Sequence, residues 1–119
     1  MNTLPRANEA VIPIEKFTMY ALNPSKDKDK AIAFDLALGY NVDNVEKLIE
    51  QIRTKLDKFP VTVKEDMGYG TRYEVLIGIV GVNGKTANVL TGWIDDVFNG
   101  EMRLTTVYVD RKQADYNDT

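Results

Sequence analysis

The chain has 119 residues, the size of a single domain, and its 44% hydrophobic and 28% charged residues are typical of a globular protein with its own core. It contains neither cysteine nor histidine, which excludes disulfides, thiolate chemistry, zinc hydrolysis and a Ser-His-Asp triad. The net charge of −3 argues against a large basic surface for nucleic acid, although it leaves room for a local basic patch.

Helical patterns occupy the first half of the sequence. Residues 1–13 contain two prolines and no periodicity, so we expect a linker. Residues 14–24 have apolar side chains at helical spacing and predict a short helix that ends at Asn23-Pro24. A second helix is expected over 27–38, with Gly39 as its C-terminal cap. A third is expected over 43–59, where Asp43 and Glu46 have capping-box spacing.

After Pro60 the apolar period changes to two, which is the spacing of β-strands. We expect a short strand at 61–66 and longer ones at 72–81, 85–95 and 102–110, with a hairpin at Asn83-Gly84. The predicted fold class is α+β, with N-terminal helices packed on a four-stranded antiparallel β-meander. It forms one domain over residues 14–110, followed by a polar tail over 111–119.

The faces of the strands decide which polar side chains meet. Simple alternation places Arg103 and Thr105 on one face of the last strand, together with two valines. The central hairpin leaves two registers open. A two-residue turn puts Arg72 on the same face as Trp93, whereas a bulged turn swaps the faces of one strand.

Several residues suggest chemistry, and each also has an ordinary structural interpretation. Lys30 lies at the start of the apolar stripe of the 27–38 helix, where it either reaches over the sheet edge or snorkels to solvent. Arg103 with Thr105 suits the binding of phosphate or carboxylate, but also an exposed strand face, and Arg72 has the same two interpretations. Trp93 either stacks on a base or belongs to the core.

Five stretches, in a fixed order, resemble one bacterial domain family over roughly residues 14–110. They are KFTMYALNP, KDKAIAFDLALGY, GYGTRYEV, GKTANVLTGWI and RLTTVYV. This family is often found at the C-terminal end of polymorphic toxins and of phage head-morphogenesis proteins. Its layout is similar to the barnase–EndoU–colicin–RelE-like ribonuclease superfamily, in which N-terminal helices precede a four-stranded antiparallel sheet.

The resemblance implies a metal-independent endoribonuclease toxin domain without a cofactor, whose substrate is RNA, and the RNA that we expect is tRNA. Its implied catalytic residues are Lys30, Arg72, Arg103 and Thr105. The arginines would stabilise charge on the phosphate while the 2′-hydroxyl attacks, and Lys30 would act in proton transfer or as a further cation. The implied substrate-binding residues are Thr106, Trp93, Tyr73 and Tyr108.

The resemblance also implies delivery within a larger secreted toxin to the cytoplasm of a target cell, and a cognate immunity protein as partner. The sequence shows no signal peptide and no apolar run near the ~18 residues that a membrane span needs. The alternative function is a non-catalytic protein-binding module, such as a phage-head accessory or immunity-like protein, which the missing histidine and the acidic balance favour. A metal-dependent nuclease built on Asp95 and Asp96 is a third hypothesis.

Overall fold

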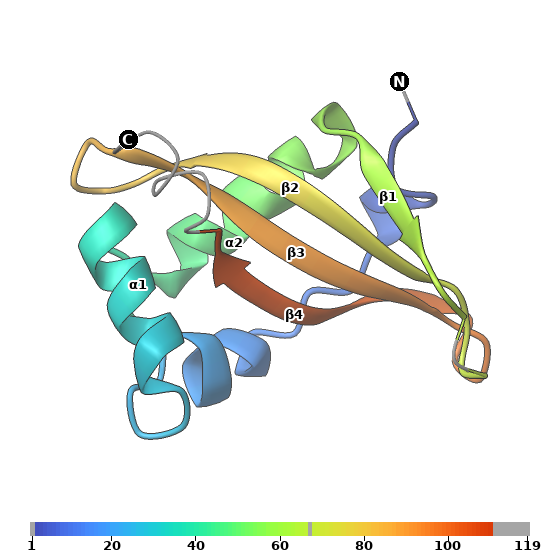
Figure 1. Ribbon diagram of the computed structural model, residues 1–119, viewed down its shortest axis with the longest axis horizontal. Helices are drawn as coiled ribbons and strands as arrows, with labels where there is room; N and C mark the ends of the chain where they lie inside the picture. The colour runs from blue at the N-terminus through green and yellow to red at the C-terminus, as the bar shows by residue number, and fades with distance from the viewer. Residues whose placement is uncertain (1, 67, 111–119) are drawn as a thin grey trace.

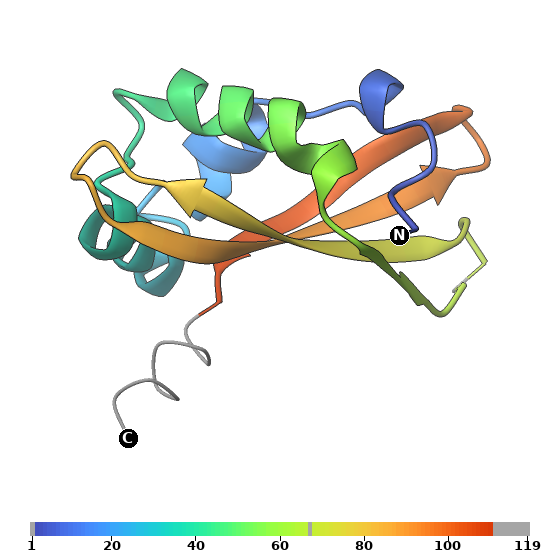
Figure 2. The same ribbon diagram turned by 90° about the horizontal axis from the view of Figure 1, so that it is seen from above.

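A computed structural model describes residues 2–66 and 68–110 and shows helices packed on a four-stranded antiparallel sheet (Figures 1 and 2). The strands pair in sequence order; they are β1 (Val61–Lys64), β2 (Arg72–Val80), β3 (Thr86–Asp96) and β4 (Glu101–Val109). The predicted α+β class and meander are therefore confirmed. The tail predicted over 111–119 lies outside the described residues.

All the helical segments that the structure describes precede β1. The two α-helices are α1 (Lys28–Leu38) and α2 (Val45–Lys55), and the shorter segments are η1 (Ala7–Glu9), η2 (Phe17–Ala21) and η3 (Leu56–Lys58). Figure 2 shows α2 along one face of the sheet, while α1 lies at one end beside β3 and β4 (Figure 1). In the described part of the chain, no helix is long and apolar enough to cross a membrane.

The capping residues at both ends of α1 are explained by its local sequence. The N-cap of α2 differs from the predicted one. The Asp27 side chain accepts a hydrogen bond from the Lys30 backbone N–H at 3.1 Å, and Gly39 ends α1 with a φ of 75°. Asn44, rather than Asp43, occupies the N-cap of α2, and its side chain makes no capping bond to the helix. The Asn44 amide donates instead to Gly39 O at 3.0 Å, which ties α2 to the end of α1.

The core lies between the helices and one face of the sheet. α2 contributes Leu48 and Ile52, and α1 contributes Phe34 and Leu38, all without exposed surface. The buried side chains of the sheet are Val75, Ile77, Ile79, Val89, Thr91, Trp93, Met102, Leu104, Val107 and Val109. The opposite face carries Arg72, Glu74, Leu90, Arg103 and Tyr108, and Figure 2 shows no helix of the described chain across most of it.

The turn between β2 and β3 decides the register that the sequence left open. Val80 pairs with Thr86, so the turn spans residues 81–85 and is not the two-residue turn. The Gly81 N–H donates to Lys85 O at 2.7 Å and closes it. Trp93 therefore lies opposite Tyr73 on the covered face, and Arg72 lies on the other face.

A β-bulge in β4 corrects the expected alternation of that strand. The register shifts between Gly92 and Trp93, and Thr105 is the extra residue opposite this point. The bulge resets the alternation, so the valines that follow join the covered face instead of sharing a face with Arg103. An added Cβ at Gly92 would lie 2.5 Å from Thr106 Cγ2 and 3.5 Å from Thr105 Oγ1. Both threonines therefore lie over the same glycine.

Both outer edges of the sheet are partly covered. On β2, the Gln51 side chain makes the two hydrogen bonds that a neighbouring strand would make. It accepts from Val80 N–H at 2.9 Å and donates to Val80 O at 2.6 Å. On β4, the Val11 N–H donates to Met102 O at 2.7 Å and Val11 O accepts from Leu104 N–H at 3.0 Å. This cover by Val11 stops just before the bulge.

Candidate functional site

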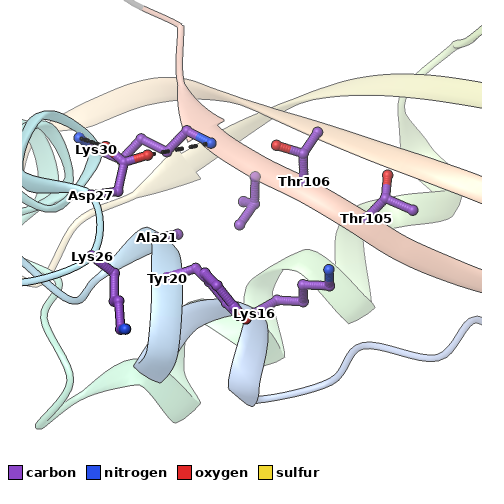
Figure 3. Close-up of a pocket in the computed structure, with 9 residues that line it drawn as sticks. Lys16, Tyr20, Ala21, Lys26, Asp27, Lys30, Thr105 and Thr106 are labelled. Carbon is purple, nitrogen blue, oxygen red and sulfur yellow. Dashed lines mark hydrogen bonds and ion pairs between the residues drawn. The ribbon is translucent and has the colours of Figure 1, made fainter.

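A pocket of about 210 Å³ lies where η2 and the start of α1 meet the bulged part of β4 (Figure 3). We call it the lysine pocket. It lies next to the stretch of β4 that Val11 covers, and no residue before Lys16 contributes to its lining. The side chains in its lining that carry polar groups are Lys16, Tyr20, Lys26, Asp27, Lys30, Thr105 and Thr106.

The lysine pocket is cationic, although the whole chain has a net charge of −3. Three lysines line it against one carboxylate, that of Asp27. Lys30 Nζ lies 3.8 Å from Asp27 Oδ2, and both side chains are more than one-third exposed, so solvent weakens this ion pair. Figure 3 shows the ends of Lys16 and Lys30 directed toward the threonines, whereas Lys26 extends away. An anion that enters between them would meet two ammonium groups.

The bulge provides two hydroxyls beside these ammonium groups. Thr105 Oγ1 is shielded from solvent and has no hydrogen-bond partner among the described residues. Burying a hydroxyl without a partner costs about 1–3 kcal/mol, and such a group calls for an explanation, for which a catalytic role or a bound water or ion are the usual candidates. Thr106 is half-buried in the same wall. The structure therefore places Lys30, Thr105 and Thr106 in the lining of one pocket, and their predicted roles stay predictions.

The two predicted arginines lie outside the lysine pocket. Arg72 and Arg103 both pair in register with Ile94, one from each side, so they share the uncovered face with β3 between them. Two strand spacings of ~4.8 Å separate their backbones by roughly 10 Å. The Arg103 guanidinium binds Glu101 Oε2 at 3.1 Å. The predicted catalytic set is thus divided between the pocket and the sheet face.

The structure contradicts a substrate-binding role for Trp93. Its side chain has no exposed surface, and its Nε1–H donates to Thr91 Oγ1 at 2.8 Å, so it belongs to the core. Tyr73 is half-buried and packs against the same core. Tyr108 is different, because its ring centroid lies 5.6 Å from Lys30 Nζ. Burial, followed by the charges of Glu74 and Asp110, raises the pKa of Tyr108, so its phenol stays protonated at neutral pH.

Sequence reasoning missed the part of the pocket that η2 provides. Lys16 and Tyr20 are four residues apart, and Lys16 Nζ lies 5.8 Å from the Tyr20 ring centroid. This spacing was a usable signal, because residues four apart share a helix face. Nothing in the local sequence, however, indicated that η2 would lie beside the bulge of β4.

The two carboxylates of Asp95 and Asp96 make structural contacts, Asp95 with the N-terminal part of the chain and Asp96 within its own turn. Asp95 forms an ion pair with Arg6, and Asp96 accepts hydrogen bonds from the backbone of Phe98 and from the Asn99 side chain. The Asn99 side chain is the main cause that lowers the pKa of Asp96. Within residues 2–66 and 68–110 there is no group of three or more His, Cys, Asp or Glu that could hold a metal ion.

A family model described as a domain of unknown function, DUF6883, matches residues 3–111. This match includes every residue that lines the lysine pocket. No curated protein and no solved structure matches the chain significantly.

Proposed function

We propose that this chain, which belongs to the DUF6883 family, is a metal-independent endoribonuclease that binds an RNA phosphodiester in the lysine pocket. The observation that carries the proposal is the convergence of Lys16, Lys30 and the two bulge threonines in one pocket of an acidic protein. Ammonium groups and hydroxyls are typical ligands of phosphate oxygens. The pocket supplies both from three separate elements.

The pocket also contains a base and an acid for cleavage. In the proposed reaction Asp27 takes the proton from the 2′-hydroxyl, whose oxygen attacks the neighbouring phosphorus. The bond from phosphorus to the 5′ oxygen breaks, and the Lys30 ammonium gives that oxygen a proton. The products are a 2′,3′-cyclic phosphate and a 5′-hydroxyl. Asp27 then releases its proton to solvent and Lys30 takes one from solvent, because the 3.8 Å between them is too long for direct transfer. DNA lacks the attacking hydroxyl and is not a substrate.

The remaining cations would hold the phosphate and the strand on either side of it. Lys16 and the hydroxyl of Thr106 would stabilise the charge that develops on the phosphate, which is usually the largest catalytic effect. In this proposal Arg72 and Arg103 contact flanking phosphates on the uncovered face of the sheet. This assigns them to substrate binding, because neither lines the pocket.

The biological setting is part of the proposal and rests on the five stretches that resemble toxin domains. We propose tRNA as the substrate, delivery within a larger secreted toxin, and a cognate immunity protein as partner. The small lysine pocket suits one exposed phosphodiester, as found in a single-stranded loop.

The test is incubation of the purified protein with bacterial tRNA in the presence of EDTA, followed by a denaturing gel. We expect discrete fragments with cyclic phosphate ends and no cleavage of DNA. Lys30→Ala should reduce the rate by about 10²–10⁴-fold, the usual contribution of a proton-transfer group. The matched control is Lys47→Ala, at an exposed lysine of α2 outside the pocket. Intact RNA with folded protein, or equal loss in both variants, would overturn the proposal.

One observation favours the alternative, a non-catalytic protein-binding module. Tyr69 and Phe98 are 64% and 77% exposed, and their ring centroids lie 6.4 Å apart. They belong to the β1–β2 and β3–β4 loops, which meet at the end of the sheet away from α1 (Figure 1). Exposed aromatic pairs are frequent anchors of protein interfaces. If the chain has this function, the folded protein cleaves no RNA and binds a protein partner. Phe98→Ser should abolish that binding, whereas Lys30→Ala should leave it unchanged.

A further inference from the structure

A second hollow, of about 260 Å³, lies between α1 and the end of β4. Its lining is Asp29, Lys30, Ala33, Tyr108 and Val109, so it shares Lys30 with the lysine pocket. Ala33 and Val109 are almost fully buried and form an apolar floor. The Tyr108 ring is half-buried beside them, and the Asp29 carboxylate is exposed at the rim.

We propose that this hollow binds one nucleobase of the RNA whose phosphate lies in the lysine pocket. The inference rests on the proposed function and identifies its ligand as a nucleotide rather than a bare phosphate. A nucleobase has a flat apolar face and a polar edge, and the hollow offers an aromatic ring, an apolar floor and a hydrogen-bond acceptor. Stacking of a base on an aromatic side chain contributes roughly five- to 150-fold in affinity.

The two hollows are arranged as a nucleotide requires. The first turn of α1 places Asp27 in one and Asp29 in the other, with Lys30 common to both. On β4, Thr106 lines the first and Tyr108 the second, and two residues of strand span about 7 Å. This is comparable with the separation of phosphate and base within one nucleotide. The Lys30 ammonium, 5.6 Å from the Tyr108 ring centroid, lies between the two hollows.

The carboxylate predicts a preference among bases. A carboxylate such as that of Asp29 accepts hydrogen bonds. Adenine, guanine and cytosine each present an exocyclic amino group with two N–H donors, whereas uracil offers only its single N3–H. We therefore expect at least one of their monophosphates to bind more tightly than uridine monophosphate, and Asp29→Ala to remove that difference.

The test measures binding by NMR titration and does not depend on cleavage. The probes are the four ribonucleoside monophosphates, ribose 5-phosphate and inorganic phosphate. We expect the best nucleotide to bind at least about fivefold more tightly than ribose 5-phosphate. Tyr108→Leu keeps apolar bulk but removes the flat ring, and it should abolish this advantage. Asp29→Ala, at an exposed position, is a second variant that should fold normally, and Lys47→Ala is the control that keeps the advantage.

The outcomes separate this inference from the ribonuclease proposal. If ribose 5-phosphate binds as tightly as every nucleotide, or Tyr108→Leu keeps the full advantage, the base site is overturned even where RNA is cleaved. A nucleotide advantage without RNA cleavage supports the base site and overturns the ribonuclease. If none of the probes binds, the base site is overturned, and the tRNA cleavage assay decides the ribonuclease proposal.

Discussion

The buried hydroxyl of Thr105 leads to a prediction in which stability and function change in opposite directions. Thr105→Val replaces the Oγ1 by a methyl group of similar shape. Because that oxygen is shielded and has no partner among the described residues, the folded state bears a desolvation cost of about 1–3 kcal/mol. The substitution should therefore raise the free energy of unfolding by about 1 kcal/mol, the lower end of this range, since small movements allow some solvation.

The expected shift in melting temperature follows from the size of the domain. Unfolding entropy is about 2.1 cal/mol/K per residue, which for 119 residues gives roughly 0.25 kcal/mol/K. A gain of about 1 kcal/mol thus corresponds to a Tm increase of ~4 °C. Thermal and urea unfolding, followed by circular dichroism, measure this change.

Thr91→Val is the matched comparison, because Thr91 is also a buried strand threonine but its hydroxyl is paired. Its O–H donates to Val75 O at 2.7 Å, and its Oγ1 accepts from Trp93 Nε1–H at 2.8 Å. Substitution leaves the indole N–H buried without its acceptor, so we expect a loss of about 1–3 kcal/mol.

The same Thr105→Val protein should bind phosphate and cleave RNA less well than the wild type. A gain in stability together with a loss of function is expected where a residue serves the site and destabilises the fold, and it is not expected for a threonine that only supports the fold. If Thr105→Val lowers stability as Thr91→Val does, the hydroxyl has a structural partner and the reasoning is refuted. If stability rises while RNA cleavage and phosphate binding stay unchanged, Thr105 has no part in the site.

Three further changes test the fold around the site. Gln51→Ala should lower the free energy of unfolding by about 1–3 kcal/mol, because the backbone of Val80 at the edge of β2 loses its side-chain partner. The control Glu50→Ala, on the exposed side of α2, should change the free energy of unfolding little. Equal effects of the two variants in urea unfolding would contradict this prediction. The lowered pKa of Asp96 means that its carboxylate stabilises the fold above the ordinary value of 3.8 and that this contribution disappears as pH falls through the lower folded pKa. Asn99→Ala should raise the pKa of Asp96, as measured by NMR titration. An unchanged Asp96 pKa would show that the Asn99 side chain is not what lowers it. Gly92→Ala should cost roughly 1–3 kcal/mol, because its Cβ meets a side chain of the bulge at 2.5 Å, and normal stability would show that the bulge yields easily.

The sequence by itself determined the elements and their order. Helical and strand periods, the end of α1 at Gly39 and the presence of a hairpin at Asn83-Gly84 depend on neighbours along the chain, so they can be identified without the fold. The length of that hairpin turn was left open by the sequence. Lys30, Thr105 and Thr106, which a resemblance suggested as site residues, line one pocket, and their roles stay predictions.

Only the tertiary structure decided which polar groups share a site. The bulge at Thr105 arises from the register between β3 and β4, which a single strand does not specify, and it placed the two valines that follow on the covered face. The same register separated Arg72 and Arg103 from the pocket. Lys16 approaches β4 because η2 packs against the core through Phe17, a contact between segments far apart in the sequence. Strand alternation is a local property, but the meeting of distant side chains depends on how the whole chain packs.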